Sequence, residues 1–111
     1  PLTVDITTTG RRSGLPRRIE IWTVKVGERL VIGGTPGPRN WFANLRADPA
    51  MVLHLKDDPA VDLAYDAVEV TDPAIRRDIW THASTEWYRD RTAVEDLIAS
   101  APTVELAPRA G

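Results

Sequence analysis

Much of the chain alternates apolar with polar residues, which is the pattern of a β-strand with one buried face. This alternation predicts five strands, over residues 4–9, 18–26, 29–33, 51–56 and 61–70. It shifts by one position at Ile21–Trp22 and again at Val68. Such a shift turns the following side chains to the other face, so we expect a β-bulge or, at Ile21–Trp22, a strand covered on both faces. Bulges in long strands bend a sheet into a small closed barrel.

Glycine and proline interrupt the strands and predict the loops. Residues 33–38 read GGTPGP, which ends regular structure. A short helix is expected next, because Trp41 and Leu45 lie one helical turn apart and Pro49 closes the segment. Gly27-Glu28 fits a tight hairpin loop between the second and third strands.

The last third of the chain is predicted to be mainly helical. Asp72-Pro73 is an N-cap followed by proline at the first helical position, and apolar residues up to Ala83 recur at helical spacing. A capping box at residues 92–95 predicts a second helix that Pro102 ends. Residues 103–106 are expected to return as a final strand.

These elements predict a mainly β protein with helices, of the α+β class. The first strands are joined by loops too short for parallel crossovers, so the sheet is expected to be antiparallel. A small barrel of about six strands, with a short helix after the third strand and helices near the C-terminus, accommodates this order. The 111 residues are expected to form a single domain, residues 1–111.

Composition narrows the class of protein. Hydrophobic residues make up 42% of the chain and charged residues 27%, as in ordinary globular domains. No apolar run approaches the roughly 20 residues that span a bilayer, and no signal peptide opens the chain. The start at Pro1 suggests that an upstream segment is missing. The chain has no cysteine, which excludes disulfides and thiolate chemistry and fits a cytoplasmic location.

No metal site is expected. His54 and His82 have no partner at metal-ligand spacing, so both are interpreted as structural or surface residues. The acidic cluster of Asp57, Asp58 and Asp62 is interpreted as a solvated hairpin tip.

The most informative local feature is a basic turn on a slightly acidic chain. Residues 7–18 read TTTGRRSGLPRR, with four arginines, whereas the whole chain carries 14 Lys+Arg against 16 Asp+Glu. Gly10 and Gly14 allow a tight turn, and arginine forks match phosphate or carboxylate oxygens. The segment predicts a focused anion site, with a solvated turn as the alternative. A nucleic-acid-binding barrel is not favoured, because the basic cluster contains no aromatic residue.

Two motifs together resemble the deazaflavin-dependent nitroreductase family. They are TTTGRRSGLPR at residues 7–17 and PGPRNWFANLRADP at residues 36–49. Members are split β-barrel oxidoreductases that use coenzyme F420, a deazaflavin with a phosphodiester and a glutamate tail. The resemblance therefore implies an antiparallel split β-barrel with a basic rim for the tail and an apolar slot for the ring. The cofactor-binding residues that it implies are Thr8, Thr9, Arg11, Arg12, Ser13, Arg17, Pro38, Arg39, Trp41 and Asn44.

The implied activity is transfer of a hydride from reduced F420 to a quinone, a nitroaromatic or an activated enone. No side chain need act as a nucleophile, so no catalytic residue is assigned. Solvent, Tyr65, Tyr88 and His82 are the candidate proton donors. The chain departs from the family pattern in lacking its N-terminal helix, in a shorter loop at residues 35–37, and in Gly34, which replaces a serine near the substrate.

Alternatives remain open at this point. One is an FMN-binding split-barrel reductase, whose cofactor phosphate would suit the same turn. Another is a non-catalytic carrier of F420 or of an anionic lipid, and Asn44 could cap the cofactor loop instead of touching a ligand. The expected partner is a small-molecule redox substrate, with no nucleic acid and no integral membrane segment. The chain is expected to be a monomer or a homodimer.

The large aromatic residues are expected to divide between the core and the site. Trp22 is expected in the core, as large aromatics of small barrels usually are. Both Trp22 and Trp41 are alternatively candidates to line the ring slot, and for Trp41, beside the glycine-proline loop, the choice between core and slot stays open. Trp80 is expected to pack a helix onto the sheet, with a flap of Trp80, Trp87 and Tyr88 over the substrate as the alternative.

Overall fold

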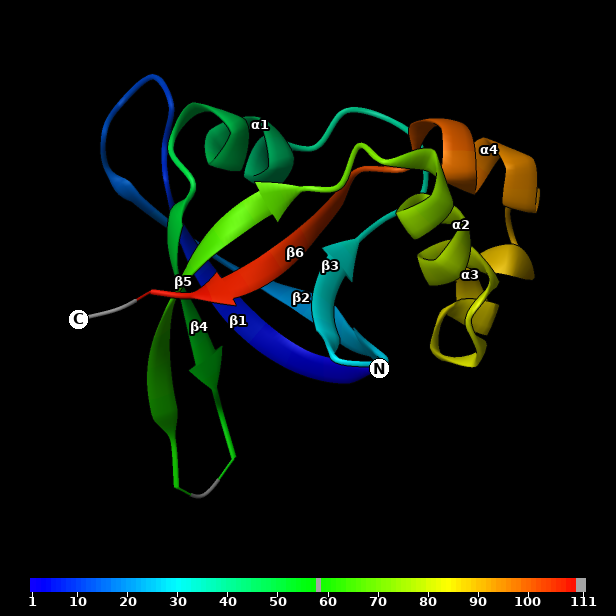
Figure 1. Cartoon of the computed structure of the whole chain (residues 1–111). Coiled ribbons are helices and arrows are strands. Elements are labelled where there is room, and N and C mark those ends of the chain that lie inside the picture. Colours follow the sequence, from blue (N-terminus) through cyan, green and yellow to red (C-terminus); the bar gives the residue numbers. More distant parts are fainter. Residues whose placement is uncertain (58, 110–111) are drawn as a thin grey trace.

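Six strands close into one antiparallel barrel in the order β1-β2-β3-β6-β5-β4 (Figure 1). The structure is a computed structural model that describes residues 1–57 and 59–109, so Asp58 of the expected hairpin tip lies outside the described residues. The strands are β1 Leu2–Thr9, β2 Pro16–Val26, β3 Arg29–Gly33, β4 Ala50–Leu55, β5 Val61–Glu69 and β6 Thr103–Pro108. The helices are α1 Asn40–Ala47, α2 Pro73–Thr81, α3 Glu86–Arg89 and α4 Val94–Ser100, with a 3-10 turn at Ala83–Thr85. The predicted α+β split-barrel class is confirmed.

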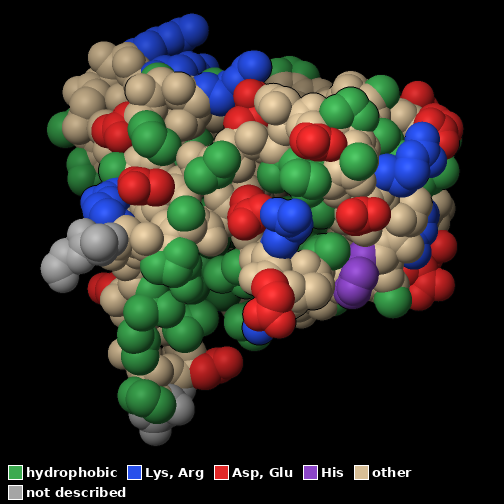
Figure 2. All heavy atoms as spheres, in the orientation of Figure 1, with side chains coloured by type: hydrophobic (Ala, Val, Ile, Leu, Met, Phe, Trp, Pro, Cys, Tyr) green, Lys and Arg blue, Asp and Glu red, His purple; other side chains and the backbone are tan. Residues whose placement is uncertain are grey.

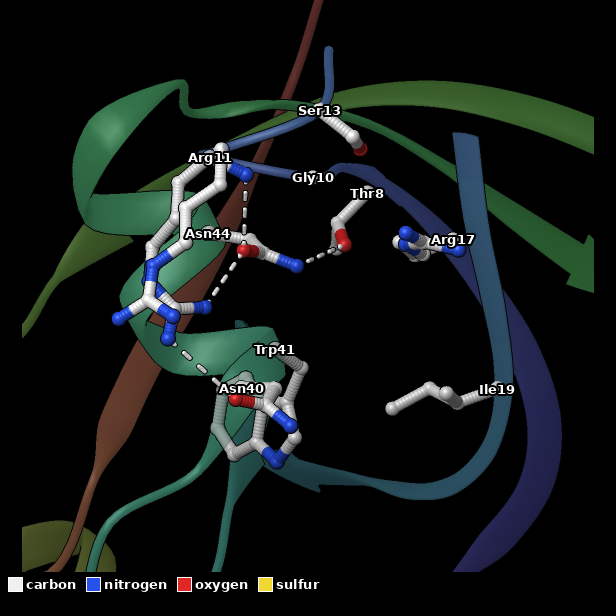
Figure 3. A pocket seen from close by; sticks show the side chains of 10 residues that line it. Thr8, Gly10, Arg11, Ser13, Arg17, Ile19, Asn40, Trp41 and Asn44 are labelled. Atoms are coloured by element: carbon white, nitrogen blue, oxygen red, sulfur yellow. Dashed lines mark hydrogen bonds between the residues drawn. The ribbon is translucent and has the colours of Figure 1, made fainter. Parts of the chain in front are cut away.

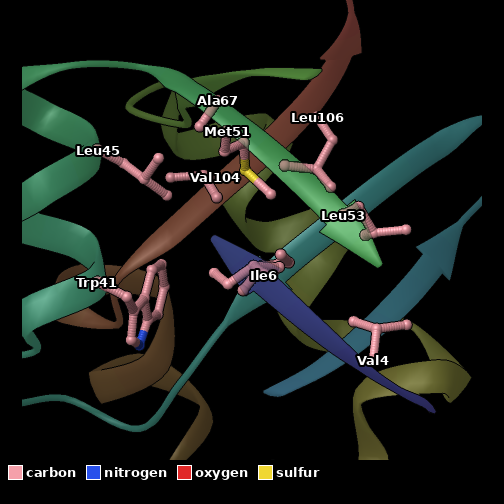
Figure 4. Close-up of a cluster of buried hydrophobic side chains, with 10 residues drawn as sticks. Val4, Ile6, Trp41, Leu45, Met51, Leu53, Ala67, Val104 and Leu106 are labelled. Carbon is pink, nitrogen blue, oxygen red and sulfur yellow. The ribbon is translucent and has the colours of Figure 1, made fainter. Parts of the chain in front are cut away.

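Alternating residues of the strands fill the barrel interior. Val4 and Ile6 of β1 point inward and are fully buried, and they pack with Met51 and Leu53 of β4 (Figure 4). Trp41 of α1 enters the same cluster, so the short helix closes one end of the barrel over this core. Successive side chains of a strand point alternately into and out of a barrel, so the apolar residues at every second position fill the interior.

No β-bulge lies at either predicted shift. β1 and β2 pair without interruption from Leu2 opposite Thr23 to Thr9 opposite Pro16. Instead β2 is covered on both faces: Ile21 packs against the barrel core, whereas Val24 packs against the helices. β5 likewise pairs with β6 without interruption through Val68, which is 53% exposed. At Ile21–Trp22 the alternative of a strand covered on both faces is therefore confirmed, whereas the bulge expected at Val68 is wrong.

Helices α2, α3 and α4 gather at one side of the barrel and form a second core with β2 and β3 (Figure 1). Trp80 of α2 is 1% exposed, and its Nε1–H donates to Thr103 Oγ1 at 3.1 Å, which satisfies the indole while its ring is buried. The prediction that Trp80 packs a helix onto the sheet is confirmed. Arg76 ties α2 to α4, because its buried guanidinium donates to the carbonyl groups of Leu97 and Ala101.

Of the two N-terminal caps predicted for helices, the one at Asp72 is confirmed and the one at Thr92 is wrong. The Asp72 carboxylate accepts hydrogen bonds from two N–H groups of the first turn of α2, which confirms the N-cap. Helix α2 stops short of Ala83. The capping box at Thr92 is wrong: the Thr92 N–H donates to Tyr88 O and so still closes α3. Helix α4 starts after Ala93, which makes no side-chain cap.

Both histidines have structural partners. His54 is buried and makes two hydrogen bonds of 2.7 Å: one joins its Nε2 and Thr7 Oγ1, and the other joins its Nδ1 and Asp62 Oδ1. His82 bonds Ser84 in the 3-10 turn. Among residues 1–57 and 59–109, no group of three or more metal-ligating side chains is placed to hold an ion. Within the same residues, the helices are all too short or too polar to cross a bilayer.

Candidate cofactor groove

The basic segment forms a tight turn between β1 and β2. The Gly10 N–H donates to Leu15 O at 2.8 Å, and the Gly14 N–H donates to Gly10 O at 2.8 Å. Gly14 has a φ of 71°, in the left-handed region that residues with a Cβ rarely adopt, so this position requires glycine. The turn projects from the barrel, and basic side chains stand out at the top left of the molecule above it (Figure 2).

Helix α1 holds the turn in place through Asn44. The buried Asn44 Oδ1 accepts hydrogen bonds from the Arg11 N–H at 3.1 Å and from Arg11 Nη1 at 2.9 Å. Its Nδ2 donates to Thr8 Oγ1 at 3.2 Å (Figure 3). The Asn44 amide therefore joins α1 both to the end of β1 and to the turn. Arg11 also reaches Asn40 Oδ1 at 3.4 Å. The Arg11 side chain therefore fastens the turn to α1, and Asn44 caps the loop.

A hollow of about 340 Å³ opens between this turn, β2 and α1. We call it the turn hollow; its lining is Thr8, Gly10, Arg11, Arg12, Ser13, Arg17, Ile19, Asn40, Trp41 and Asn44. Arg17 and Ile19 of β2 face Trp41 and Asn44 of α1 across it (Figure 3). Arg12 and Arg17 are exposed, and within the described part of the chain neither makes a hydrogen bond or an ion pair. The hollow thus combines apolar walls with two cations that lack a partner among residues 1–57 and 59–109.

A second hollow of about 450 Å³ lies further along β2. We call it the aromatic hollow; its lining is Glu20, Ile21, Trp22, Gly34, Thr35, Arg39, Trp87 and Tyr88. The Trp22 and Trp87 rings meet edge to face with centroids 4.8 Å apart, and Trp87 meets Tyr88 in the same way at 5.1 Å. Burial raises the pKa of the Tyr88 phenol, so this group keeps its proton at neutral pH.

The two hollows follow one another along a strand edge that is free of pairing. β3 pairs with β2 only over Val24–Val26, so in the described structure the stretch 16–22 has a strand partner on its β1 side alone. Arg17, Ile19 and Ile21 alternate along one face of this stretch, the first two in the turn hollow and the third in the aromatic hollow. We call the two hollows together the groove.

Most residues predicted from the motifs meet in the turn hollow. These are Thr8, Arg11, Arg12, Ser13, Arg17, Trp41 and Asn44. Thr9 faces a smaller hollow beside Pro16 and Ala50 instead. Arg39 belongs to the aromatic hollow, and Pro38 lines neither of the two, although its carbonyl accepts a bond from Arg39 at 3.1 Å.

Sequence reasoning missed Ile19 in the apolar wall, whereas both tryptophans that it considered for the ring slot line a hollow. Ile19 lines the turn hollow, and its spacing of two from Arg17 was the available signal. Trp22 packs against the second core as expected, but it is only partly buried and also lines the aromatic hollow. Trp41, for which core and slot both stayed open, belongs to both: it is 8% exposed, packs in the barrel core and lines the turn hollow. Of the candidate proton donors, Tyr88 alone lines the groove among the described residues.

Comparisons with known proteins agree on the fold and point to one family. The model of the F420H(2)-dependent quinone reductase family matches residues 1–98. A solved structure named F420 reductase superposes with a TM-score of 0.67 at 22% identity, over 99% of this chain and 88% of its own. A conserved hypothetical protein from Mycobacterium tuberculosis gives 0.74 at 19% identity, over 99% and 74%. A putative pyridoxamine 5'-phosphate oxidase from Listeria innocua gives 0.71 at 15% identity, over 97% and 84%. At these identities the structures share the fold alone.

Proposed function

The chain belongs to the F420H(2)-dependent quinone reductase family, and from that premise we propose that it holds F420 along the groove and reduces a quinone, nitroaromatic or enone there. Membership makes the protein an F420-dependent oxidoreductase. The proposal concerns where the cofactor lies and which acceptors are used.

The observation that carries the proposal is the pair of unpartnered arginines beside an apolar wall. Arg12 and Arg17 would hold the phosphate and the carboxylates of the tail, because guanidinium groups without a protein partner are free to make charge-assisted bonds. Ile19 and Ile21 would lie beside the flat ring along the unpaired edge of β2. The residues present therefore fit an anionic stem joined to an apolar ring. When bound in its reduced form, F420 supplies a hydride.

The aromatic hollow is the proposed place of the acceptor. Trp22 and Trp87 offer apolar aromatic walls for a conjugated molecule. Tyr88 keeps its proton because burial raises its pKa, so its hydroxyl is the proposed source of the proton that completes reduction. Tyr65 packs against the barrel core and His82 lies in the 3-10 turn, which favours Tyr88 among the three.

Equilibrium titration with F420 tests the placement. The double variant Arg12→Ala/Arg17→Ala should bind F420 weaker by about 2–4 kcal/mol, since each lost charge-assisted bond contributes roughly 1.5–3 kcal/mol before solvent screening. The matched control is Arg46→Ala/Arg77→Ala, which also removes two exposed arginines but from ion pairs with Glu69 and Glu95 outside the groove. Its affinity should stay near that of the wild type.

A parallel titration with FMN completes the design. The melting temperature of the Arg12/Arg17 variant should change little, because exposed turn side chains make few packing contacts. The proposal is refuted if this variant and the control bind F420 equally well, or if the wild type prefers FMN.

A further inference from the structure

Arg39 places a fixed positive charge in the wall of the aromatic hollow. Its Nη2 donates to Thr35 O and to Thr35 Oγ1, each at 2.9 Å, and its Nη1 donates to Pro38 O at 3.1 Å. All three acceptors belong to the loop between β3 and α1, and all are neutral oxygens. The loop therefore orients the guanidinium before any ligand arrives, but leaves its charge uncompensated.

The glycines of this loop leave room for that side chain. A Cβ placed on Gly34 would lie 3.6 Å from Arg39 Nε, and one on Gly37 would lie 3.0 Å from Arg39 Nη1. Gly37 also has a φ of 136°, which residues with a Cβ rarely adopt. A side chain at position 34 would therefore contact the Arg39 guanidinium in its present position. Among the described residues, Arg39 Nε makes no hydrogen bond and stays available as a donor.

The carboxylate in the same hollow is paired with a lysine and not with Arg39. Glu20 lines the aromatic hollow, and its Oε2 accepts a hydrogen bond from Lys56 Nζ at 2.6 Å. No ion pair joins Arg39 to an acidic side chain within the described part of the chain. Arg39 therefore presents a positive charge to a molecule in the hollow, which Tyr88 also lines.

We propose that Arg39 is a catalytic residue that binds the acceptor oxygen on which negative charge develops during reduction. This inference rests on the proposed function and adds a residue role that the tail-binding residues do not have. It assigns Arg39 to the acceptor, whereas the sequence motif suggested that it binds the cofactor.

The chemistry requires such a group. Adding a hydride, which is two electrons and one proton, to a quinone gives the hydroquinone monoanion, with the charge on one oxygen. The hydride would come from F420H2, which also releases one proton to solvent and is thereby oxidised to F420. A second proton, from Tyr88 or solvent, gives the neutral hydroquinone. A preorganised guanidinium facing that oxygen stabilises the monoanion more than the neutral quinone, so it accelerates the step.

Steady-state kinetics with F420H2 and menadione test this role. Arg39→Gln should lower kcat by about 10- to 100-fold, the lower range for loss of an oxyanion donor because the hollow is open to solvent. Its dissociation constant for F420 should stay within about twofold of the wild type. Arg39→Lys keeps the charge and should recover part of kcat. Arg46→Gln, an exposed arginine of α1 outside the groove, is the matched control.

A second variant separates charge from loop bracing. Thr35→Val removes one of the three bonds that hold Arg39 but keeps the guanidinium, so its kcat should fall far less than that of Arg39→Gln. The inference is overturned if Thr35→Val and Arg39→Gln lose kcat equally, if Arg39→Gln weakens F420 binding with kcat intact, or if Arg39→Gln turns over like the wild type. Failure of the wild type to bind F420 would instead refute the proposed function.

Discussion

The two ends of the groove hold their cations in opposite ways. At the turn hollow, Arg12 and Arg17 are exposed and have no partner among the described residues. At the aromatic hollow, Arg39 is partly buried and bonded to three oxygens of its own loop. Free arginines can follow a flexible anionic tail and contribute to affinity, whereas a fixed arginine is suited to a charge that appears only during reaction.

We therefore expect the two ends of the groove to have separate roles, F420 binding at the turn hollow and turnover at the aromatic hollow. Changes at the turn hollow should alter the dissociation constant for F420 and leave kcat nearly unchanged at saturation. Changes at the aromatic hollow should do the reverse. The following three variants test whether F420 binding and turnover depend on different ends of the groove.

The largest effect is expected from Asn44→Ala. Loss of the buried amide leaves the Thr8 hydroxyl and the Arg11 N–H without their partner, which should lower the free energy of unfolding by about 2–3 kcal/mol and weaken F420 binding as the turn loosens. Urea unfolding and F420 titration measure the two effects. Asn40→Ala, which removes an exposed contact of 3.4 Å, is the control and should cost less than about 0.5 kcal/mol. Equal stability of both variants would contradict the bracing role of Asn44.

A smaller effect, confined to turnover, is expected from Tyr88→Phe. Removing the proposed proton donor should lower kcat by about 10- to 100-fold, the lower range for general acid catalysis because solvent can substitute. Burial raises the Tyr88 pKa, so its contribution should persist up to at least about pH 10, the ordinary tyrosine value, before it fades. Rates measured against pH check both points. Tyr65→Phe, on β5 away from the groove, is the control, and a Tyr88→Phe variant as fast as this control would exclude Tyr88 as the donor.

The smallest effect is expected from Asp5→Asn, on the outside of the barrel. Hydrogen bonds from Lys56 and then Arg18 hold the pKa of Asp5 below its ordinary value. A lowered carboxyl pKa gives stability that is present above the ordinary aspartate pKa and is lost as pH falls through the folded value. The variant should therefore lose slightly less stability than the wild type on acidification, as unfolding across acidic pH would show. A changed affinity for F420 in this variant would mean that the groove is not independent of the barrel exterior.

Local patterns in the sequence were sufficient to predict the barrel and the position of the basic turn. Alternation located the strands, and charge density with glycine spacing located the turn, because both depend on neighbouring residues. The Asn44 bridge to Thr8 and Arg11 and the meeting of Trp22 with Trp87 could not be derived in this way, since closure of the barrel and packing of α3 bring them together.

Trp22 and Arg39 show what spacing along the chain leaves undetermined. Trp22 follows Ile21 in a strand whose two faces pack against different cores, so alternation alone could not say which core receives it. Arg39 is near Trp41 in the motif, but its side chain folds back onto Thr35 and reaches the aromatic hollow. The direction of a long side chain depends on the loop that it bonds, which spacing along the chain does not reveal.

A crystal structure of the complex with F420 would show directly whether the groove holds the cofactor. We expect the phosphate or the tail carboxylates to lie within hydrogen-bond distance of Arg12 and Arg17, and the ring to lie along β2 between Ile19 and Trp22. A cofactor tail bound away from these two arginines, or a ring outside the groove, would contradict this expectation.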